Sequence, residues 1–322
     1  MDAVVLAGGY ATRLWPITKH RPKMFLPVGD STVVDRIFAG LGSDDRIDSV
    51  YVSTNERFAE AFEQHIREAP FEKPELSVEE TTAESEKLGV IGALDQLIDR
   101  EGITDDLLVI AGDNLLSFDP AEFVDFFYER ETPAIAAYDV GSLERATSYG
   151  VVEIDGERVV DFQEKPENPK STLASIACYA FPAGNLDGIG EYLRGDNNPD
   201  EPGGFIQWLH TRDTVRAFCF EDAWFDIGTA ESYLEAVAWT LDGEAMIADG
   251  ATVTNSNIGS NVHVMDGAEV TGSTIRDSVI FSDATVVDCD LRDSIIDEDT
   301  HVEGLDLSSA LIGAHTRLEN GE

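Results

Sequence analysis

The carboxyl-terminal part of this chain carries a repeat that few folds can accommodate. From residue 253 to residue 318, one branched apolar residue returns every five or six positions. The series is Val253, Ile258, Val264, Val270, Ile275, Ile280, Val286, Leu291, Ile296, Val302, Leu307, Ile312 and Leu318. An α-helix repeats every ~3.6 residues and a strand every two, so neither element alone produces this spacing. A hexapeptide-repeat β-helix does, because each side of its three-sided coil contributes one inward-facing apolar residue.

We therefore predict a left-handed β-helix here, with about 18 residues in each coil and roughly four coils. Small or polar residues are expected to turn the corners, namely Asn257, Gly259, Gly267, Gly272, Ser282 and Asp283. The alternative is an irregular all-β appendage, which the five-residue spacings and the scarcity of glycine leave open.

A different pattern fills residues 3–140. Continuous apolar runs of strand length, such as Ala3–Leu6 and Leu107–Ile110, are typical of buried parallel strands. Segments with apolar residues at helical spacing lie between them, and Ser31 and Asp119 are placed as helix starts. Alternating strands and helices predict an α/β fold with a doubly wound, mostly parallel Rossmann-like sheet.

Shorter strands follow this α/β pattern. A hairpin is expected at Asp155-Gly156, and a further strand over residues 214–220. A helical pattern that ends at Leu241 then closes the first domain. We place the boundary after Asp242, which gives domains at residues 1–242 and 243–322.

The charge of the chain limits its partners. The 63 acidic and 22 basic residues give a formal charge of -41, which would be repelled by nucleic acid and by an anionic membrane. No apolar run approaches the roughly 18 residues of a membrane-spanning helix. The acidic residues are scattered through a chain that is 43% hydrophobic, so they belong to a folded surface adapted, we expect, to molar salt. No signal-peptide pattern precedes the first strand, so we expect a cytoplasmic protein.

The three cysteines, Cys178, Cys219 and Cys289, are widely separated along the chain. Their spacing provides neither a disulfide framework nor a metal clip, and they are predicted to be buried.

The segment after the first strand carries the chemistry. It reads Leu6-Ala7-Gly8-Gly9-Tyr10-Ala11-Thr12-Arg13-Leu14-Trp15-Pro16-Ile17-Thr18-Lys19-His20-Arg21-Pro22-Lys23. A glycine pair lets backbone N–H groups approach phosphate oxygens, and Arg13 and Lys23 add positive charge. The segment lacks the GxGxxG pattern of dinucleotide-binding folds and the GxxxxGK[ST] pattern of P-loops. It therefore indicates a phosphate-binding loop of another class.

This string resembles the signature of the sugar-1-phosphate nucleotidylyltransferases, L-A-G-G-x-G-T-R-L-x-P-x-T-x-x-x-P-K. The matching residues are Leu6, Ala7, Gly8, Gly9, Thr12, Arg13, Leu14, Pro16, Thr18, Pro22 and Lys23. Ala11 stands where the signature has its third glycine, which removes conformational freedom at positive φ. The resemblance extends over residues 1–240, and a carboxyl-terminal β-helix occurs in some members of the family.

Later motifs follow in the family's order. Glu80 and Gly89 resemble the element that holds the nucleotide base, and Asp113, after a strand, resembles the aspartate that binds magnesium. Asp226, in the motif Trp224–Thr229, resembles the second metal carboxylate. The resemblance thus implies Mg²⁺ as cofactor, held by Asp113 and Asp226.

The sugar phosphate would be held by another set of residues. Tyr149-Gly150 and Glu164-Lys165 resemble the family's sugar-phosphate site, with Glu164 for sugar hydroxyls and Lys165 for the phosphate. The implied reaction is attack by the sugar 1-phosphate on the α-phosphorus of a nucleoside triphosphate, with release of pyrophosphate. Arg13, Lys23 and Lys165 are the expected catalytic residues, and Leu6, Ala7, Gly8, Gly9 and Thr12 complete the nucleotide site.

Within the family, the segment Pro22–Pro27 resembles the glucose-1-phosphate thymidylyl- and uridylyltransferase branch, which favours dTTP or UTP and glucose 1-phosphate. Three alternatives stay open. The first alternative is a mannose-1-phosphate guanylyltransferase. The second is a bifunctional nucleotidyl- and acetyltransferase with His263, His301 or His315 as a base, and the third is a non-catalytic regulatory subunit. Because solenoids of this kind associate side to side, a homo-oligomer is expected.

Overall fold

The computed structural model describes residues 1–9, 11–79, 88–195 and 197–321. Contacts within the chain divide it into two compact units. The first unit comprises Met1–Gly9 and Asp35–Trp224, and the second comprises Tyr10–Val34 and Phe225–Glu322. The predicted domain boundary after Asp242 stays a prediction.

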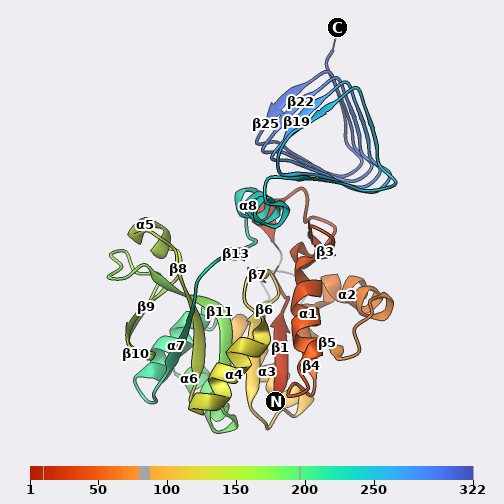
Figure 1. Ribbon diagram of the computed structural model, residues 1–322. Coiled ribbons are helices and arrows are strands. Elements are labelled where there is room, and N and C mark those ends of the chain that lie inside the picture. The colour runs from red at the N-terminus through yellow and green to blue at the C-terminus, as the bar shows by residue number, and fades with distance from the viewer. Residues whose placement is uncertain (10, 80–87, 196, 322) are drawn as a thin grey trace. The chain divides into compact units, whose positions relative to one another are not determined.

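A Rossmann-like sheet forms the centre of the first unit (Figure 1). In the described residues its strands run in the order β5-β4-β1-β6-β11-β8-β12-β10-β9. The strands are β1 (Asp2–Leu6), β4 (Val50–Asn55), β5 (Pro74–Glu79), β6 (Leu107–Ala111), β8 (Ala134–Asp139), β9 (Gly150–Asp155), β10 (Arg158–Glu164), β11 (Leu173–Phe181) and β12 (Arg216–Phe220). The half made of β5, β4, β1 and β6 is parallel, and β11 runs antiparallel to β6. The predicted doubly wound α/β fold is confirmed, as is the hairpin at Asp155-Gly156.

Helices cover this sheet. They are α1 (Val33–Ser43), α2 (Glu56–Glu68), α3 (Val90–Glu101), α4 (Pro120–Arg130), α5 (Leu143–Ala146), α6 (Asp187–Arg194) and α7 (Pro202–His210). Asp119 caps α4 as predicted, because its carboxylate accepts a hydrogen bond from Ala121 N and Pro120 occupies the first turn. The core lies between sheet and helices, where Val4 and Val109 of the strands pack with Leu94 of α3 and Phe205 of α7.

The amino-terminal segment of the second unit differs from the prediction at one point. Ser31 does not start a helix but lies in the two-residue strand β3 (Ser31–Thr32), which pairs with β2 (Pro27–Val28). Gly29 permits the turn between them because its φ is +71°. Helix α1 therefore begins at Val33.

Parallel strands in three sheets form a β-helix of the predicted left-handed type, drawn in blue in Figure 1. The first sheet holds β14 (Ala245–Ile247), β17 (Val262–Val264), β20 (Val279–Ile280), β23 (Ile295–Ile296) and β26 (Leu311–Ile312). The second holds β15 (Thr252–Thr254), β18 (Glu269–Thr271), β21 (Thr285–Val287), β24 (His301–Glu303) and β27 (Arg317–Glu319). The third holds β16 (Asn257–Ile258), β19 (Thr274–Arg276), β22 (Asp290–Arg292) and β25 (Asp306–Ser308). The predicted inward residues, such as Val270, Ile275 and Ile280, are fully buried in its core.

The coil is shorter than predicted. Val279 pairs with Ile295, and Ile295 with Leu311, so each of these coils takes 16 residues rather than about 18. Tight corners explain the difference, because Asp277, Asp293 and Ser309 stand at one corner with φ of +46°, +47° and +53°. Asn and Asp tolerate this left-handed conformation better than other residues with a side chain, so few corner glycines are needed. Of the predicted corner residues, Gly267, Gly272 and Asp283 have positive φ, whereas Asn257 lies in β16.

Two further features complete the second unit. Strand β13 (Trp224–Asp226) leads into α8 (Ala230–Leu241), where Thr229 and Ser232 form a capping box. Among the described residues, no helix is both long and apolar enough to cross a bilayer. Cys178 and Cys289 are buried as predicted, but Cys219 in β12 is exposed.

Candidate active site

The glycine pair lies at the switch point of the first unit's sheet. Gly8 and Gly9 follow β1, which lies between β4 and β6 in the sheet. The chain builds β4 and β5 on one side of β1 and then crosses to β6 on the other side. Gly112 N donates to Leu6 O at 2.9 Å, so the carboxyl ends of β1 and β6 adjoin and Asp113 follows directly. Ligands of doubly wound folds bind in the crevice at such a point.

Buried polar side chains fix the backbone before the glycine pair. Asn55 Nδ2 donates to Gly8 O at 2.8 Å, and Thr54 Oγ1 donates to Ala7 O at 3.2 Å. Glu79 is 8% exposed, and its Oε1 accepts from Ser53 Oγ at 3.0 Å. Burial raises the pKa of Glu79, and the hydrogen bond from Ser53 opposes that rise.

No sequence motif identified this polar group. Its signal in the sequence is weak, since strands β4 and β5 end in the polar residues Asn55 and Glu79 but contain other polar residues as well. A Cβ placed on Gly8 would lie 3.0 Å from Glu79 Oε1, so the first glycine of the pair has little room for a side chain. Glu79 thus stands beside the predicted phosphate loop.

Asp113 is held by its neighbour. Asn114 Nδ2 donates to Asp113 Oδ1 at 2.9 Å, and Asn114 Oδ1 accepts from Trp224 Nε1 at 2.6 Å. Asn114 is 4% exposed, so its amide orientation is fixed on both sides. One buried amide therefore orients the predicted metal carboxylate and ties it to the start of the Trp224–Thr229 motif.

The predicted sugar-phosphate residues come together in the first unit. Lys165 follows β10 with φ of +42°, and its N donates to Tyr149 O at 3.1 Å. Its Nζ lies 2.8 Å from Glu201 Oε1 and 3.6 Å from Glu164 Oε1. Burial raises the pKa of Glu164, and Lys165 acts in the opposite direction. Burial of Lys165 would lower its pKa, but Glu201 and Glu164 outweigh this and raise it.

Two glycines leave room for the Glu164 carboxylate. A Cβ on Gly150 would lie 2.9 Å from Glu164 Oε2 and 2.5 Å from Phe162 Cζ. A Cβ on Gly203, at the start of α7, would overlap the same carboxylate at 1.7 Å. The predicted residue Gly150 is thus required by packing around Glu164.

The proposed base-binding element is only partly described. Glu80 lies outside the described residues. Gly89 caps α3 with φ of +78°, and a Cβ there would lie 2.5 Å from the backbone of Pro199. Ile91 N also donates to Pro199 O at 2.9 Å, so the chain's own backbone makes the close approach at Gly89.

The second unit contains the rest of the signature. Ala11 has φ of +49° and ψ of +40°, so it adopts the left-handed conformation that the signature's glycine would supply. Thr18 Oγ1 donates to Ala11 O at 2.8 Å, and Thr12 starts a 3₁₀ turn with Arg13 and Leu14. Lys23, 9% exposed, starts a second 3₁₀ turn.

Arg13 and Asp226 approach the same glycine. A Cβ placed on Gly228 would lie 3.1 Å from Arg13 Nη2 and 3.6 Å from Asp226 Oδ1. Residues far apart in the sequence are thereby brought together within the second unit. Asp113 belongs to the first unit, so the shared metal site of Asp113 and Asp226 stays a prediction. Carboxylate oxygens are ligands that Mg²⁺ accepts, so the chemistry of both residues fits that ion.

The three histidines of the β-helix occupy different environments. His263 lies in β17 and is 6% exposed, and burial lowers its pKa. His301 lies in β24, and its Nε2 lies 3.2 Å from Glu303 Oε2. His315 stands at an exposed corner with φ of +58°. The three are thus not equivalent corner residues, and His263 is closed off from solvent.

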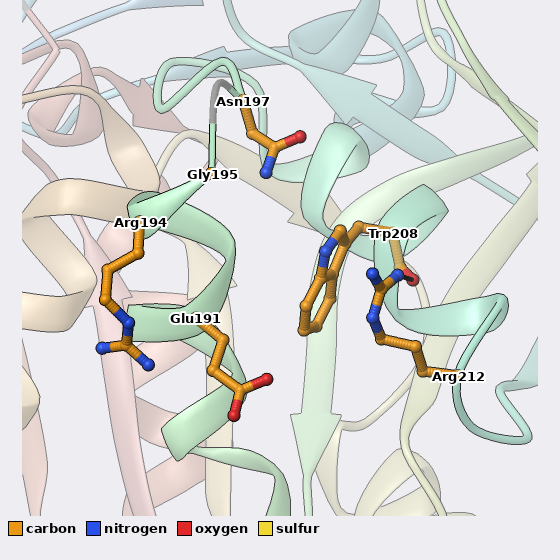
Figure 2. Close-up of a pocket in the computed structure, with 6 residues that line it drawn as sticks. All are labelled: Glu191, Arg194, Gly195, Asn197, Trp208 and Arg212. Atoms are coloured by element: carbon orange, nitrogen blue, oxygen red, sulfur yellow. Dashed lines mark hydrogen bonds between the residues drawn. The ribbon is translucent and has the colours of Figure 1, made fainter.

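A separate pocket lies on α6 and α7 of the first unit (Figure 2). Its lining residues are Glu191, Arg194, Gly195, Asn197, Trp208 and Arg212. The Arg212 guanidinium stacks over the Trp208 ring at 4.0 Å, and none of the predicted site residues lines this pocket.

Solved structures share the fold. A Bacillus anthracis protein assigned as a glucose-1-phosphate thymidylyltransferase aligns with a TM-score of 0.62 and 24% identity, over 74% of this chain and 95% of that one. A UDP-glucose pyrophosphorylase solved with UDP-glucose aligns with a TM-score of 0.61 and 22% identity, over 73% and 96% of the two chains.

Sequence relatives extend further along the chain. A Sulfolobus acidocaldarius protein assigned as a mannose-1-phosphate guanyltransferase is 29% identical over 292 residues, which are 87% of this chain and 76% of the relative. The bifunctional protein GlmU of Methanocaldococcus jannaschii is 28% identical over 83% of this chain, which spans 61% of that relative. A glucose-1-phosphate adenylyltransferase of Mycoplasma mobile is 26% identical over 89% and 82% of the two chains.

A family model covers most of the chain. Residues 2–243 match the family model described as nucleotidyl transferase. That range contains the glycine pair, Arg13, Lys23, Asp113, Glu164, Lys165 and Asp226. The chain belongs to the nucleotidyl transferase family.

Proposed function

We propose that the protein transfers a nucleotidyl group from a nucleoside triphosphate to a sugar 1-phosphate. A phosphate oxygen of the sugar 1-phosphate forms a bond to the α-phosphorus, the bond from that phosphorus to the β-phosphate bridging oxygen breaks, and pyrophosphate leaves. The nucleophile is already an anion, so no strong base is needed. Catalysis then depends on aligning two mutually repelling phosphates and on stabilising the charge of the leaving group.

The residues of this chain suit that task. The backbone of Gly8 and Gly9 and the guanidinium of Arg13 would bind the β- and γ-phosphates, with Lys23 reaching across the phosphates. Lys165 would release Glu201 and bind the incoming phosphate instead. The exchange is feasible because Lys165 is half-exposed and pairs with Glu201 through a single ion pair. Glu164, already positioned by Gly150 and Gly203, would accept hydrogen bonds from sugar hydroxyls.

Asp113 and Asp226 would hold Mg²⁺, which offsets phosphate charge and orients the triphosphate. Asn114 would keep the Asp113 carboxylate oriented by the hydrogen bond described above.

The meeting of Arg13 and Asp226 at Gly228 carries the proposal. A phosphate-binding guanidinium and a metal-binding carboxylate need to act on the same triphosphate, and a Cβ on Gly228 would lie within 3.6 Å of both the Arg13 guanidinium and the Asp226 carboxylate. Gly228 thus leaves room for both groups because it has no side chain.

For the substrates, we propose dTTP or UTP with glucose 1-phosphate, based on the segment Pro22–Pro27. The Sulfolobus acidocaldarius relative favours a second candidate, GTP with mannose 1-phosphate. Acetyl transfer is a weaker candidate, because this chain spans only 61% of the GlmU relative and buries His263.

The test is pyrophosphate release over a grid of dTTP, UTP, GTP, CTP and ATP against glucose, galactose, mannose and N-acetylglucosamine 1-phosphates, with Mg²⁺ in molar KCl. One productive combination is expected. With it, Arg13→Ala should lower kcat by about 10²–10³-fold. Arg67→Ala removes an exposed arginine that pairs only with Glu63 in the described contacts, and serves as the control. A folded protein without turnover in every combination, or near-normal turnover of Arg13→Ala, would contradict the proposal.

A further inference from the structure

The middle of one outer face of the β-helix is buried. Along the sheet β14-β17-β20-β23-β26, Ile280 and Ile296 point into the coil, so their neighbours Val279, Ile295 and Asp297 point outward. Val279 and Ile295 are nevertheless 0% exposed and Asp297 is 2% exposed. Another part of the second unit therefore covers this face.

The cover includes the signature segment itself. The cavity between the signature segment and the β-helix is lined by residues 16–17 and 19–21 of the segment and by residues 297–298 and 313–316 of the β-helix. A Cβ placed on Gly313 would lie 2.7 Å from Pro16 Cβ. The cation of Arg21 lies 4.8 Å from the centroid of the Phe281 ring. The segment that precedes Lys23 thus packs directly on the solenoid.

An ion pair fixes the position of this contact. Arg21 Nη2 lies 2.7 Å from Asp297 Oδ1 and 3.0 Å from Glu298 Oε1. Asp297 Oδ1 also accepts from Glu298 N at 2.9 Å. Burial raises the pKa of Asp297, and Arg21 acts in the opposite direction.

A buried ion pair is a poor source of stability, because desolvation of the two charges offsets their attraction. Its geometric demand is high, since both partners have to meet in one arrangement. Such a pair is therefore better suited to fixing the register of two segments than to holding them together.

The position of Arg21 in the chain gives this register a consequence. Arg21 lies two residues before Lys23, a separation of at most about 7 Å. Thr18 lies three residues before Arg21, and its Oγ1 donates a hydrogen bond to Ala11 O, two residues before Arg13. A shift of the segment on the solenoid would therefore move both predicted phosphate-binding side chains.

We propose that Arg21 is a positioning residue, which anchors the signature segment on Asp297 so that Arg13 and Lys23 meet the triphosphate. The β-helix then contributes to nucleotidyl transfer by supporting the phosphate-binding segment rather than by chemistry of its own. This inference rests on the proposed function.

The test compares Arg21→Met, Asp297→Asn, their double variant and Arg21→Lys. Asp290→Asn is the matched control, because Asp290 pairs with Arg292 at 3.2 Å on an exposed face of the same solenoid. On folded protein, Arg21→Met and Asp297→Asn should each lower kcat/KM for the triphosphate by about 10–100-fold. KM for the sugar 1-phosphate should stay within about twofold, because Glu164 and Lys165 belong to the first unit. Arg21→Lys should recover part of the loss, and the double variant should be no worse than the worse single variant.

The overturning results are distinct. If the variants melt earlier but keep their kinetic constants below melting, the pair is only structural and the proposal fails. Equal losses for both substrates would also contradict it. Arg21→Lys and Asp297→Asn keep the test decisive if Arg21→Met does not fold.

Hydrogen exchange separates this inference from the proposed function. Asp297→Asn should speed amide exchange in residues 12–25, and Asp290→Asn should not. If the unmodified protein shows no turnover on any substrate pair, the proposed function fails, while unchanged exchange in Asp297→Asn would overturn the anchoring itself.

Discussion

The carboxylate of Glu164 lies where a side chain on Gly203 would begin. A Cβ at that position would stand 1.7 Å from Glu164 Oε2 and 2.7 Å from its Cδ. Gly203 belongs to α7 and Glu164 to β10, so a helix start and a strand end leave space for one carboxylate.

We predict that Gly203→Ala displaces Glu164 and lowers kcat/KM for the sugar 1-phosphate by about 10²-fold. The triphosphate KM should change little, because the phosphate-binding segment lies elsewhere in the chain. Gly188→Ala, in α6, is the control, since its Cβ would meet only Trp208 at an ordinary 3.5 Å. Steady-state kinetics on both substrates decides the matter, and an unchanged sugar-phosphate constant for Gly203→Ala would show that Glu164 does not bind the sugar.

Glu201→Gln should shift the pH profile of kcat/KM for the sugar 1-phosphate toward lower pH at both limbs. Burial and then the like charge of Glu201 hold the pKa of Glu164 up, so removing that charge lets Glu164 ionise at lower pH. Lys165 loses the hydrogen bond that raises its pKa, so it also loses its proton at lower pH. The ratio of the variant's kcat/KM to that of the unmodified enzyme, taken at each pH, cancels the effect of the substrate's own titration. Glu191→Gln, on the exposed side of α6, is the control and should leave this ratio independent of pH. A shift of the acid limb to higher pH in Glu201→Gln would contradict the assignment.

Ala11→Gly should raise the free energy of unfolding by up to about 1 kcal/mol, because a residue with a Cβ in the left-handed region carries a steric cost that glycine avoids. Denaturant unfolding measures the change. Ala39→Gly, at an exposed position of α1, should lower the same quantity by about 1 kcal/mol. Loss of stability in both variants would mean that Ala11 is not strained.

The melting temperature should rise by several degrees between 0.1 M and 2 M KCl. A formal charge of -41 makes the folded chain repel itself, and salt shortens the range of that repulsion from about 10 Å at 0.1 M to less than about 3 Å above 1 M. Sucrose at matched water activity should produce a smaller rise, since it does not screen charge. A melting temperature that is flat or falls with KCl would exclude adaptation to molar salt.

Local patterns predicted the elements that local chemistry determines. The continuous apolar runs before Gly8 and before Gly112 are buried parallel strands, because nothing polar interrupts them. Asp119 followed by Pro120 is a helix start, since the side chain and the fixed φ both act within one turn. The five- and six-residue spacing identified the solenoid for the same reason, as each inward residue is fixed by its own side of the coil.

The wrong predictions, the coil length and the helix start at Ser31, concern residue types that readily adopt more than one conformation. Asp277 and Asp293 turn corners without glycine, so the assumption of six residues for each side of the coil overestimated the coil length. Ser31 is a good helix cap, but Gly29 allows a hairpin that uses it as a strand residue. Intrinsic preference does not decide between such outcomes.

The contacts that the sequence did not reveal are long-range. Arg21 and Asp297 are 276 residues apart, and no periodicity relates them. Ser53 and Glu79 meet through the register of β4 and β5, which pairs Asn55 with Glu79. Pairing information of this kind is absent from a single chain's local pattern.

The corners of the solenoid also arrange its charge. Asp277 and Asp293 recur one coil apart at one corner, and Asp283 and Asp299 recur at another, all with left-handed φ. Successive parallel strands lie about 4.8 Å apart, so the two aspartates at each corner are stacked one above the other along the axis. At such a separation two charges in water repel by about 0.9 kcal/mol. The residues that let the coil turn without glycine thus place like charges one above the other at two corners, and dissolved salt weakens the repulsion within each pair.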